Sequence, residues 1–573
     1  MLLLNMPNFL GFEASHKVPD RLVQHDKIVI VLQTKMRKSI LVYLSCLVFA
    51  TYSAKPPKWS KNYSVSGSIH FPKASIVQPF QAWFDSKNKR VRVDYNDGTV
   101  KKFEFVNATG SYYYSLIPDY HRDGITQICI GTRKPMRKAS VLLPNARDFQ
   151  YEQTKRIKGV KCDGFGSKEV NEFYEKKVTL WVGYNRKSGE KIPYPVQFDT
   201  TLYYKESGGL RDHFFIDYSD YKTSDIPEDV FQIFDPKDCY ETLHTRHKKL
   251  SPFDELPDPS AAHHIDLEFE RFTRKYNVLY KNSREKMLRK DIFRDNLRYI
   301  NSINKANLGY KLAVNHFADR TPDEIGILNQ SNFQRDYLDA RKFPEKFENL
   351  DNDAIPESFD WREHNAVGPV RDQGDCGSCY AFAVVGAVEG AYFLKTGKLV
   401  NLSVQALMDC SWMQRNRGCL GGTARGSYRW ITRYGGIPTE EDYGPYLGIE
   451  DICRPISASK LIPITGYVRL PSNDKRALKV AIFKRGPIAV TIDTSPRSFQ
   501  FYESGIYNDP SCRSGNDEQS HAALAVGYGE LDGKKYWLIK NSWSDYWGMK
   551  GYMLMDASGN TCGILNTATY PEM

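Results

Sequence analysis

The stretch GDCGSCYAF, Gly374 to Phe382, holds two cysteines separated by Gly377 and Ser378. Such a pair fits a redox couple, half of a metal site, or one structural cysteine beside a reactive one. The residues that follow are almost wholly apolar until Lys395, which is typical of a helix buried in the centre of a domain. If Cys379 opens that helix, the positive end of the helix dipole favours its thiolate, and Cys379 becomes a candidate nucleophile.

A nucleophilic cysteine needs a base, and two downstream motifs offer one with a partner. His521 in SHAALAVGYG precedes a strand-like apolar run, and Asn541 in KNSWSDYWG follows the strand-like YWLIK. An imidazole beside a thiol can form a thiolate–imidazolium pair, and an amide oxygen can orient the ring without adding charge. A lone histidine near a strand is more often a satisfied core residue. Three such residues in three distinctive contexts favour catalysis.

At this point the sequence resembles the papain-like, cathepsin L-type cysteine peptidases. Cys376 to Tyr380 fits the family signature C-G-[SA]-C-[WY]. The runs PVRDQGDCGSCYAF, NLSVQALMDC, CLGG, HAALAVGYG and KNSW follow in the family's order, and the resemblance covers roughly Asp266 to Met573. It implies an α+β, two-lobed fold with a helical left lobe and a β-barrel-like right lobe over residues 353–573, and a cysteine endopeptidase activity.

The resemblance also assigns roles to residues. Cys379 would attack the scissile carbonyl, His521 would activate it and protonate the leaving amine, and Asn541 would orient His521. Gln373 and the backbone N–H of Cys379 would form the oxyanion hole. Substrate would contact Gly377, Gly421, Gly422, Thr423, Ala424, Thr491, Ala522, Trp543 and Thr567. Because the S2 positions among these carry no charge, the family pattern implies an uncharged P2 side chain.

The seven cysteines from Cys376 onward fit the same reading. Family pairing joins Cys376 with Cys419, Cys410 with Cys453, and Cys512 with Cys562, which leaves Cys379 outside the disulfides. A redox couple would bond Cys376 to Cys379 and destroy the nucleophile. A zinc site has no second close pair of Cys or His to complete four ligands. We therefore expect no metal and no cofactor.

Ahead of the peptidase region, a helical stretch from about Asp266 to Asn307 carries a stripe with a spacing of three or four residues. The stripe matches the ERFNIN motif of the family's inhibitory propeptide: Glu285, Arg289, Phe293, Asn296, Ile300 and Asn304. Alternating residues then match the family's GNFD motif, with Ala313 in place of Gly, followed by Asn315, Phe317 and Asp319; they alternate as a strand would. Either acid sensing or a plain turn role fits Asp319.

The propeptide match implies a zymogen. Residues 263–352 would lie across the cleft, opposite in direction to substrate, until cleavage near Asp351 to Ile355. The chain's own propeptide is then its inhibitor, and its partners are protein and peptide substrates.

Residues 55–244 are rich in tyrosine and in period-2 patches, which predicts an antiparallel all-β accessory domain. The stretch Arg90 to Val106, with Asn-Asp-Gly in its middle, indicates a hairpin. Two of Cys129, Cys162 and Cys239 can pair. Residues 245–262 indicate a linker. This layout resembles the insect 26/29 kDa proteases, in which a separate N-terminal chain accompanies a papain-like chain, and it implies association after processing.

The segment from Met36 to Ala54 is typical of a secretory signal and is too short to span a bilayer comfortably. Residues 1–35 lack signal character, so translation could start at Met36. The acceptor sequons at Asn62, Asn107 and Asn329 fit a secreted glycoprotein. The destination would be a lysosome or the extracellular space.

Composition limits the remaining classes of function. A length of 573 residues suggests several domains, and 41% hydrophobic with 26% charged residues fits a globular protein. The net charge of +11 is spread along the chain and does not indicate nucleic-acid binding. The rival hypothesis is a binding protein whose β-domain holds a lipid, glycan or partner while the peptidase region is a passive scaffold. A complete Cys, His, Asn and Gln set argues against a scaffold.

Overall fold

The computed structural model describes residues 54–121, 124–134, 142–170, 174–187, 190–205, 208–232, 234–241, 262–326, 328, 339–344, 355–515 and 518–573. The signal up to residue 53, nearly all of the linker, the sequon at Asn329 and residues 351–354 of the expected cleavage region lie outside the described residues. Within them the chain is α+β, as predicted.

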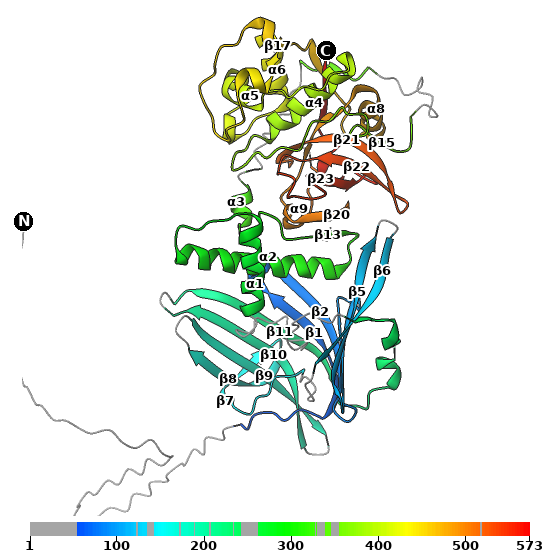
Figure 1. Ribbon diagram of the computed structural model, residues 1–573. Coiled ribbons are helices and arrows are strands. Elements are labelled where there is room, and N and C mark those ends of the chain that lie inside the picture. Colours follow the sequence, from blue (N-terminus) through cyan, green and yellow to red (C-terminus); the bar gives the residue numbers. More distant parts are fainter. Residues whose placement is uncertain are drawn as a thin grey trace, which may run out of the picture. The chain divides into compact units, whose positions relative to one another are not determined.

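The N-terminal region, residues 62–241, is a curved sheet of twelve strands (Figure 1). Its order is β12-β6-β5-β4-β3-β2-β1-β11-β10-β9-β8-β7, so two meanders meet where β1 pairs with β11. The strands are β1 (Asn62–Phe71), β2 (Ile76–Asp85), β3 (Arg90–Tyr95), β4 (Val100–Asn107), β5 (Gly110–His121), β6 (Gly124–Lys134), β7 (Gln150–Ile157), β8 (Val160–Val170), β9 (Tyr174–Lys187), β10 (Glu190–Tyr204), β11 (Leu210–Lys222) and β12 (Tyr240–Glu241).

The predicted hairpin is confirmed as β3 and β4, with Tyr95 opposite Val100. The turn between them needs left-handed backbone, with φ of 48° at Asn96 and 85° at Gly98, and these residue types tolerate that conformation best. One pairing departs from the antiparallel prediction: the two-residue β12 runs parallel to β6. A disulfide joins Cys129 of β6 to Cys239, the residue just before β12.

The propeptide region folds into α1 (Ala262–Lys275), α2 (Ser283–Ala306), β13 (Tyr310–Leu312) and α3 (Pro322–Gly326). Two helices replace the single predicted stretch, because the chain turns at Asn277 with φ of 51° and restarts at Asn282. The Asn282 side chain accepts from the N–H of Glu285, and Glu285 accepts from the N–H of Lys281, which makes a capping box.

The strand predicted over 313–319 is wrong, since these residues form turns after β13 ends. The side chain of Asn315 accepts from the N–H of Phe317, and its carbonyl accepts from the N–H of Ala318. An asparagine that bonds its own backbone in this way competes with strand pairing. The alternation of the motif therefore reflects a folded loop.

The left lobe of the peptidase region is helical, with α4 (Cys379–Thr396), α5 (Val404–Cys410), α6 (Ala424–Tyr434) and α7 (Glu440–Tyr443). As predicted, α4 is buried along most of its length. It packs closely on β21 (His521–Leu531) of the right lobe, because a Cβ at Gly386 would lie 2.7 Å from Leu524. This glycine lets the helix approach the strand.

The strands of the right lobe form an open row, not a closed barrel, in the order β13-β20-β23-β22-β21-β19-β24-β18-β14, with β15 beside β21. The propeptide strand β13 extends this row at β20. The remaining elements are β14 (Arg341–Lys342), β15 (Phe359–Asp360), β16 (Ile437–Pro438), β17 (Leu461–Ile462), β18 (Gly466–Arg469), α8 (Lys475–Arg485), β19 (Ile488–Ile492), α9 (Arg497–Gln500), β20 (Tyr502–Tyr507), β21 (His521–Leu531), β22 (Lys534–Lys540), β23 (Tyr552–Asp556) and β24 (Ala568–Glu572).

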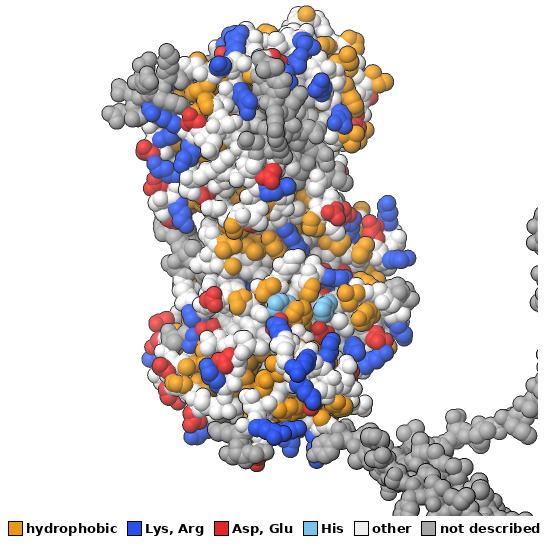
Figure 2. All heavy atoms as spheres, turned by 180° about the vertical axis from the view of Figure 1, so that it is seen from behind, with side chains coloured by type: hydrophobic (Ala, Val, Ile, Leu, Met, Phe, Trp, Pro, Cys, Tyr) orange, Lys and Arg blue, Asp and Glu red, His pale blue; other side chains and the backbone are white. Residues whose placement is uncertain are grey.

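Charged side chains of both signs are interspersed over the face seen in Figure 2. In the described part of the chain, we find no helix with the length and apolar character that crossing a bilayer requires.

Candidate active site

Cys379 is the first residue of α4 and is fully buried. It takes part in no disulfide, whereas its neighbour Cys376 is bonded to Cys419. The N–H of Gly377 donates to the Cys419 carbonyl at 2.9 Å, so the bridge also fixes the loop that leads into the helix. The helix dipole therefore acts on the thiol as the sequence predicted.

His521 begins β21 and is also fully buried. Its Nε2 lies 2.8 Å from the side-chain oxygen of Asn541, and the Trp543 ring lies 5.0 Å from the imidazole between ring centroids. Burial lowers the pKa of His521 to about 4, although the Asn541 amide and the Leu328 carbonyl both favour the charged ring. The imidazole is therefore neutral in the zymogen at neutral pH.

Gln373 is fully buried and its side-chain amide is held in one orientation. The hydroxyl of Ser542 donates to its Oε1 at 2.7 Å, which turns Nε2 toward the site. The hydroxyl of Tyr446 donates to the Gln373 backbone carbonyl at 2.8 Å. Sequence reasoning missed Ser542 and Tyr446, although Ser542 stands beside Asn541 in the KNSW motif.

A propeptide carbonyl occupies this position. Nε2 of Gln373 donates to the carbonyl oxygen of Leu328 at 3.0 Å, and the same carbonyl favours the charged form of His521. Leu328 itself is buried. The predicted oxyanion donor thus already binds a peptide carbonyl from the chain's own propeptide.

The predicted S2 positions fall into two groups. Thr491 of β19 stands opposite Ala522 of β21, and its N–H donates to the Thr567 carbonyl at 3.1 Å, so these three lie together. Thr423 caps the N-terminus of α6, and Ala424 begins that helix in the left lobe. No member of either group carries charge, so a pocket built from them would favour a neutral side chain.

The two glycines of the CLGG motif are needed for different structural reasons. Gly421 has a φ of 101°, which disfavours any side chain. A Cβ at Gly422 would lie 2.6 Å from the Tyr380 ring. Tyr380, the residue after Cys379, therefore packs directly behind Gly422.

The peptidase region contains three disulfides, the same three pairs that the family resemblance implies: Cys376–Cys419, Cys410–Cys453 and Cys512–Cys562. In the N-terminal region, the Cys129–Cys239 bond leaves Cys162 as a buried thiol.

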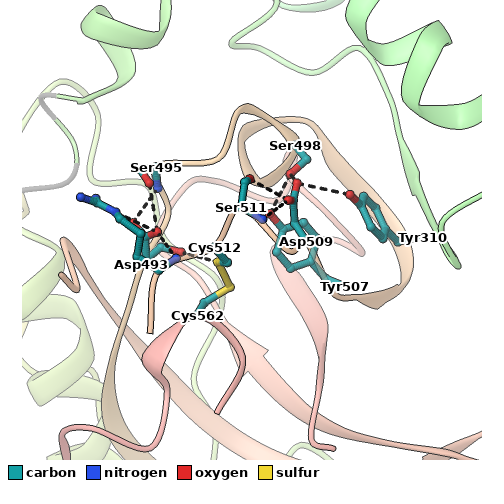
Figure 3. Close-up of a disulfide and its surroundings, with 10 residues drawn as sticks. Tyr310, Asp493, Ser495, Ser498, Tyr507, Asp509, Ser511, Cys512 and Cys562 are labelled. Carbon is teal, nitrogen blue, oxygen red and sulfur yellow. Dashed lines mark hydrogen bonds and ion pairs between the residues drawn. A yellow bond between two sulfur atoms is a disulfide. The ribbon is translucent and has the colours of Figure 1, made fainter. Parts of the chain in front are cut away.

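The propeptide docks beside the Cys512–Cys562 bridge (Figure 3). Tyr310 of β13 donates to the carboxylate of Asp509 at 3.4 Å, and Ser511 donates to the other oxygen of that carboxylate at 2.7 Å. Since β13 also pairs with β20, backbone and side chains of the propeptide both bind the right lobe.

The ERFNIN side chains fasten α2 to the rest of the propeptide. Asn296 donates to the Ala318 carbonyl at 2.8 Å, and Asn304 both donates to and accepts from the backbone of Leu312. Phe293 and Ile300 are buried in the core shared with the right lobe. The polar members of the stripe therefore satisfy backbone groups of the loop that follows the helix.

Arg289 pairs with Glu324 at 2.7 Å and donates to the carbonyl of Asp319. Burial raises the pKa of the Asp319 carboxyl, against the effect of the Tyr280 hydroxyl bonded to it. Because the pKa of Asp319 is raised in the docked propeptide, a fall in pH would favour the docked form through Asp319. The structural role of Asp319 accounts for the motif better than acid-triggered release does.

Backbone geometry accommodates one departure from the family pattern and disfavours another. Ala313 replaces Gly where φ is not positive, and its N–H donates to the Phe501 carbonyl at 2.9 Å. Ser544 stands where Gly is usual, at a φ of 66°, so the serine is held in a conformation that costs a side chain energy.

Comparisons with known proteins agree with this geometry. Residues 355–572 match the model for the papain family cysteine protease, and residues 269–325 match that for the cathepsin propeptide inhibitor domain. The chain is 41% identical over 313 residues to digestive cysteine proteinase 1 of Homarus americanus, covering 53% of this chain and 94% of that protein. It is 40% identical over 324 residues to cathepsin S of Bos taurus, covering 55% and 94% respectively.

Solved proforms are similar as well. The digestive procathepsin L2 proteinase of Tenebrio molitor superposes with a TM-score of 0.50 at 32% identity, over 54% of this chain and 100% of that one. The proform of the ragweed pollen allergen Amb a 11 gives 0.50 at 34% identity, over 57% and 89%. Residues 1–268 lie before both matched family regions.

Proposed function

The chain belongs to the papain family of cysteine proteases and carries that family's propeptide inhibitor domain, and from this we propose that it hydrolyses peptide bonds through Cys379 and His521. Loss of the propeptide would open the site to water. The pKa of His521 would then return toward its ordinary value, and the imidazole could take the thiol proton.

In the proposed reaction the thiolate sulfur of Cys379 bonds to the scissile carbonyl carbon, and the carbonyl electrons move onto oxygen. Gln373 Nε2 and the Cys379 N–H stabilise that oxyanion, and each such donor is worth about 3 kcal/mol. His521 gives its proton to the leaving amine as the C–N bond breaks. Water then attacks the thioester, His521 takes its proton, and the acid and the thiol are restored.

The observation that carries the proposal is the bond from Gln373 Nε2 to the Leu328 carbonyl. A peptide carbonyl within hydrogen-bond distance of Gln373 and next to His521 lies where a scissile carbonyl would have to bind. Asn541 accepts from the ring on one side, and Trp543 covers it. The site thus already holds the group on which it would act.

For specificity we propose an uncharged P2 side chain, apolar in preference to basic. Thr491, Ala522 and Thr567 offer no carboxylate that could pair with an arginine. We expect a Leu-at-P2 peptide to exceed an Arg-at-P2 peptide in kcat/KM by tenfold or more.

We also propose the secretory route, on the signal-like segment Met36 to Ala54 and the sequons. Asn107 is exposed at the end of β4, with its side chain bonded to Thr109, and is the more accessible acceptor. Asn62 is partly buried in β1. For the N-terminal region we propose continued association with the processed peptidase, supported by the bond from Arg497 to the carbonyl of Ala74.

The decisive experiment is acid processing of the purified zymogen at about pH 4.5 with reductant, followed by an assay on a Leu-at-P2 peptide. We expect Cys379→Ala to lower activity on the order of 10⁵-fold. Cys162→Ala is the matched control, because it removes the other thiol outside a disulfide in the described residues and should keep full activity. A processed wild-type protein that cleaves nothing and resists a thiol-directed epoxide would overturn the proposal.

A further inference from the structure

The helix α2 has two opposite faces with different partners. Its inner face carries the ERFNIN residues Arg289, Phe293, Asn296, Ile300 and Asn304. Its outer face carries Asp291, Arg294, Asp295 and Arg298, which recur at a spacing of three or four residues and so share one side of the helix. Papain-family motifs account for the inner face only.

The outer face binds the N-terminal sheet. The hydroxyl of Tyr204, at the end of β10, donates to Asp291 at 2.6 Å, and Arg211 of β11 donates to the other oxygen of Asp291 at 3.2 Å. Asp212 of β11 accepts from Arg298 at 3.1 Å. Three side chains of the sheet thus engage two positions of the helix that are seven residues apart, Asp291 and Arg298.

These ion pairs are enclosed. Asp212 is 1% exposed and Asp291 7%, so both carboxylates have left water. Burial alone would raise the pKa of Asp212, but Arg298 and Arg294 outweigh it and hold the pKa below its usual range. The pKa of Asp291 is likewise held below its usual range, because Arg294 and Arg211 outweigh the effect of burial. Buried charges of this kind persist only where every partner is present, so the sheet and the helix are complementary.

The peptidase region also contacts both the N-terminal region and α2. Arg497 of α9 donates to the carbonyl of Ala74, after β1, and its Nε lies 3.2 Å from the side-chain oxygen of Asn296 on the inner face of α2. One arginine therefore contacts the N-terminal region and the propeptide together. The sheet is placed to influence how the propeptide sits in the cleft.

We propose that the N-terminal sheet is a binding module for the propeptide helix α2 and acts as a second inhibitory element of the zymogen. The surface consists of Tyr204, Arg211 and Asp212, and its partner is an amphipathic helix with an acidic residue followed by arginines at three and seven residues. By holding the outer face, the sheet lowers the frequency with which α2 leaves its docked position. Only the activation readout below rests on the proposed peptidase function.

The test compares two Tyr→Phe variants in the full-length Cys379→Ala zymogen, which cannot process itself under the proposed mechanism. Tyr204→Phe removes the hydroxyl that bonds Asp291. Tyr184→Phe is the control, because its hydroxyl bonds Asp163 within the sheet and it is similarly buried. Amide hydrogen exchange over residues 291–300 is measured at neutral pH. We expect about tenfold faster exchange in Tyr204→Phe and no change in Tyr184→Phe.

Arg211→Gln provides a second variant. It removes the ion pair to Asp291 and the cation–π contact of Arg211 with the Tyr204 ring but keeps the Tyr204 hydroxyl, and it should speed exchange in the same segment. In the active background, Tyr204→Phe should shorten the lag of acid processing several-fold while the kcat/KM of the processed enzyme stays unchanged. The proposal is overturned if the amide exchange rates over residues 291–300 in Tyr204→Phe and Arg211→Gln both stay within twofold of the parent. It is also overturned if Tyr184→Phe speeds this exchange as much as Tyr204→Phe does. A wild-type zymogen that never gains activity contradicts the peptidase function and leaves the exchange result valid.

Discussion

On the inner face of α2, Phe293 and Ile300 are buried and the amides of Asn296 and Asn304 bond backbone groups, whereas the outer face is held by carboxylates and guanidiniums. Amides and phenyl rings do not titrate, so these inner-face contacts with the rest of the propeptide carry no pH dependence of their own. The outer face depends on ionised Asp212 and Asp291. One helix is thus fastened to two neighbours by two kinds of chemistry, which makes the faces separable by mutation.

The largest expected effect is on the inner face. Phe293→Ala should cost the propeptide about 3–5 kcal/mol of stability and so weaken its docking, because the phenyl ring packs against Phe269 and Phe272 of α1 and its loss leaves a cavity. We expect processing without acid, at a rate at least a hundredfold above wild type. The measurement is the time course of zymogen conversion at neutral pH. A variant that still requires acid for processing would show that the inner face is not the main contact that keeps the propeptide docked.

A smaller effect is expected on the outer face. Asp212→Asn removes the charge that pairs with Arg298 but keeps an acceptor of the same shape, at a cost of about 2–3 kcal/mol. Since the pKa of Asp212 is held below its usual range, its contribution is present near neutral pH and is lost as pH falls through that depressed value. Urea unfolding of the zymogen at neutral pH should show a lower midpoint. An unchanged midpoint would mean that this charge pair adds nothing net.

Part of the pH dependence of release should come from His316, between Asn315 and Phe317 of the propeptide loop. Burial lowers its pKa to about 4, reinforced by Arg320 and opposed by Asp375, while Tyr276 and Tyr546 face the ring. Docking is therefore strongest above the ordinary histidine pKa of about 6.5 and weakens as pH falls from there toward 4.

His316→Phe should keep the packing and remove this titration. We expect about tenfold slower processing than wild type at about pH 5, with little change near pH 7. The rate of zymogen conversion against pH measures it. A wild-type profile in the variant would assign the acid response to other groups.

The smallest effect lies outside both faces. Ser544→Gly relieves a left-handed backbone at φ 66° and should stabilise the peptidase domain by about 0.5–1 kcal/mol. Thermal unfolding of the processed enzyme should show a slightly higher Tm. A lower Tm would mean that contacts of the serine outweigh the strain.

The sequence was most informative where function depends on side chains in fixed local contexts. Cys379, His521 and Asn541 each stand beside the turn or strand that places them, so short motifs sufficed. The turn at Asn315 was misread as a strand, because a loop whose side chains face the peptidase alternately mimics period two.

Two features had no sequence signal. The group in the oxyanion position is the Leu328 carbonyl, and every residue has such a carbonyl. The pair of Asp212 with Arg298 joins residues 86 positions apart, and no local periodicity reports such a contact.

The Leu328 carbonyl also has a kinetic consequence. While the chain is intact, the inhibitor is tethered to its own target, and tethering gives an effective concentration of up to about the millimolar range. The first cut between Leu328 and the peptidase domain ends the tether and leaves the bond from Gln373 to the Leu328 carbonyl in place. From then on occupancy follows mass action, and dilution alone empties the cleft. At high concentration the cleaved zymogen would stay inhibited by its bound propeptide. The same molecules would become active when they are diluted.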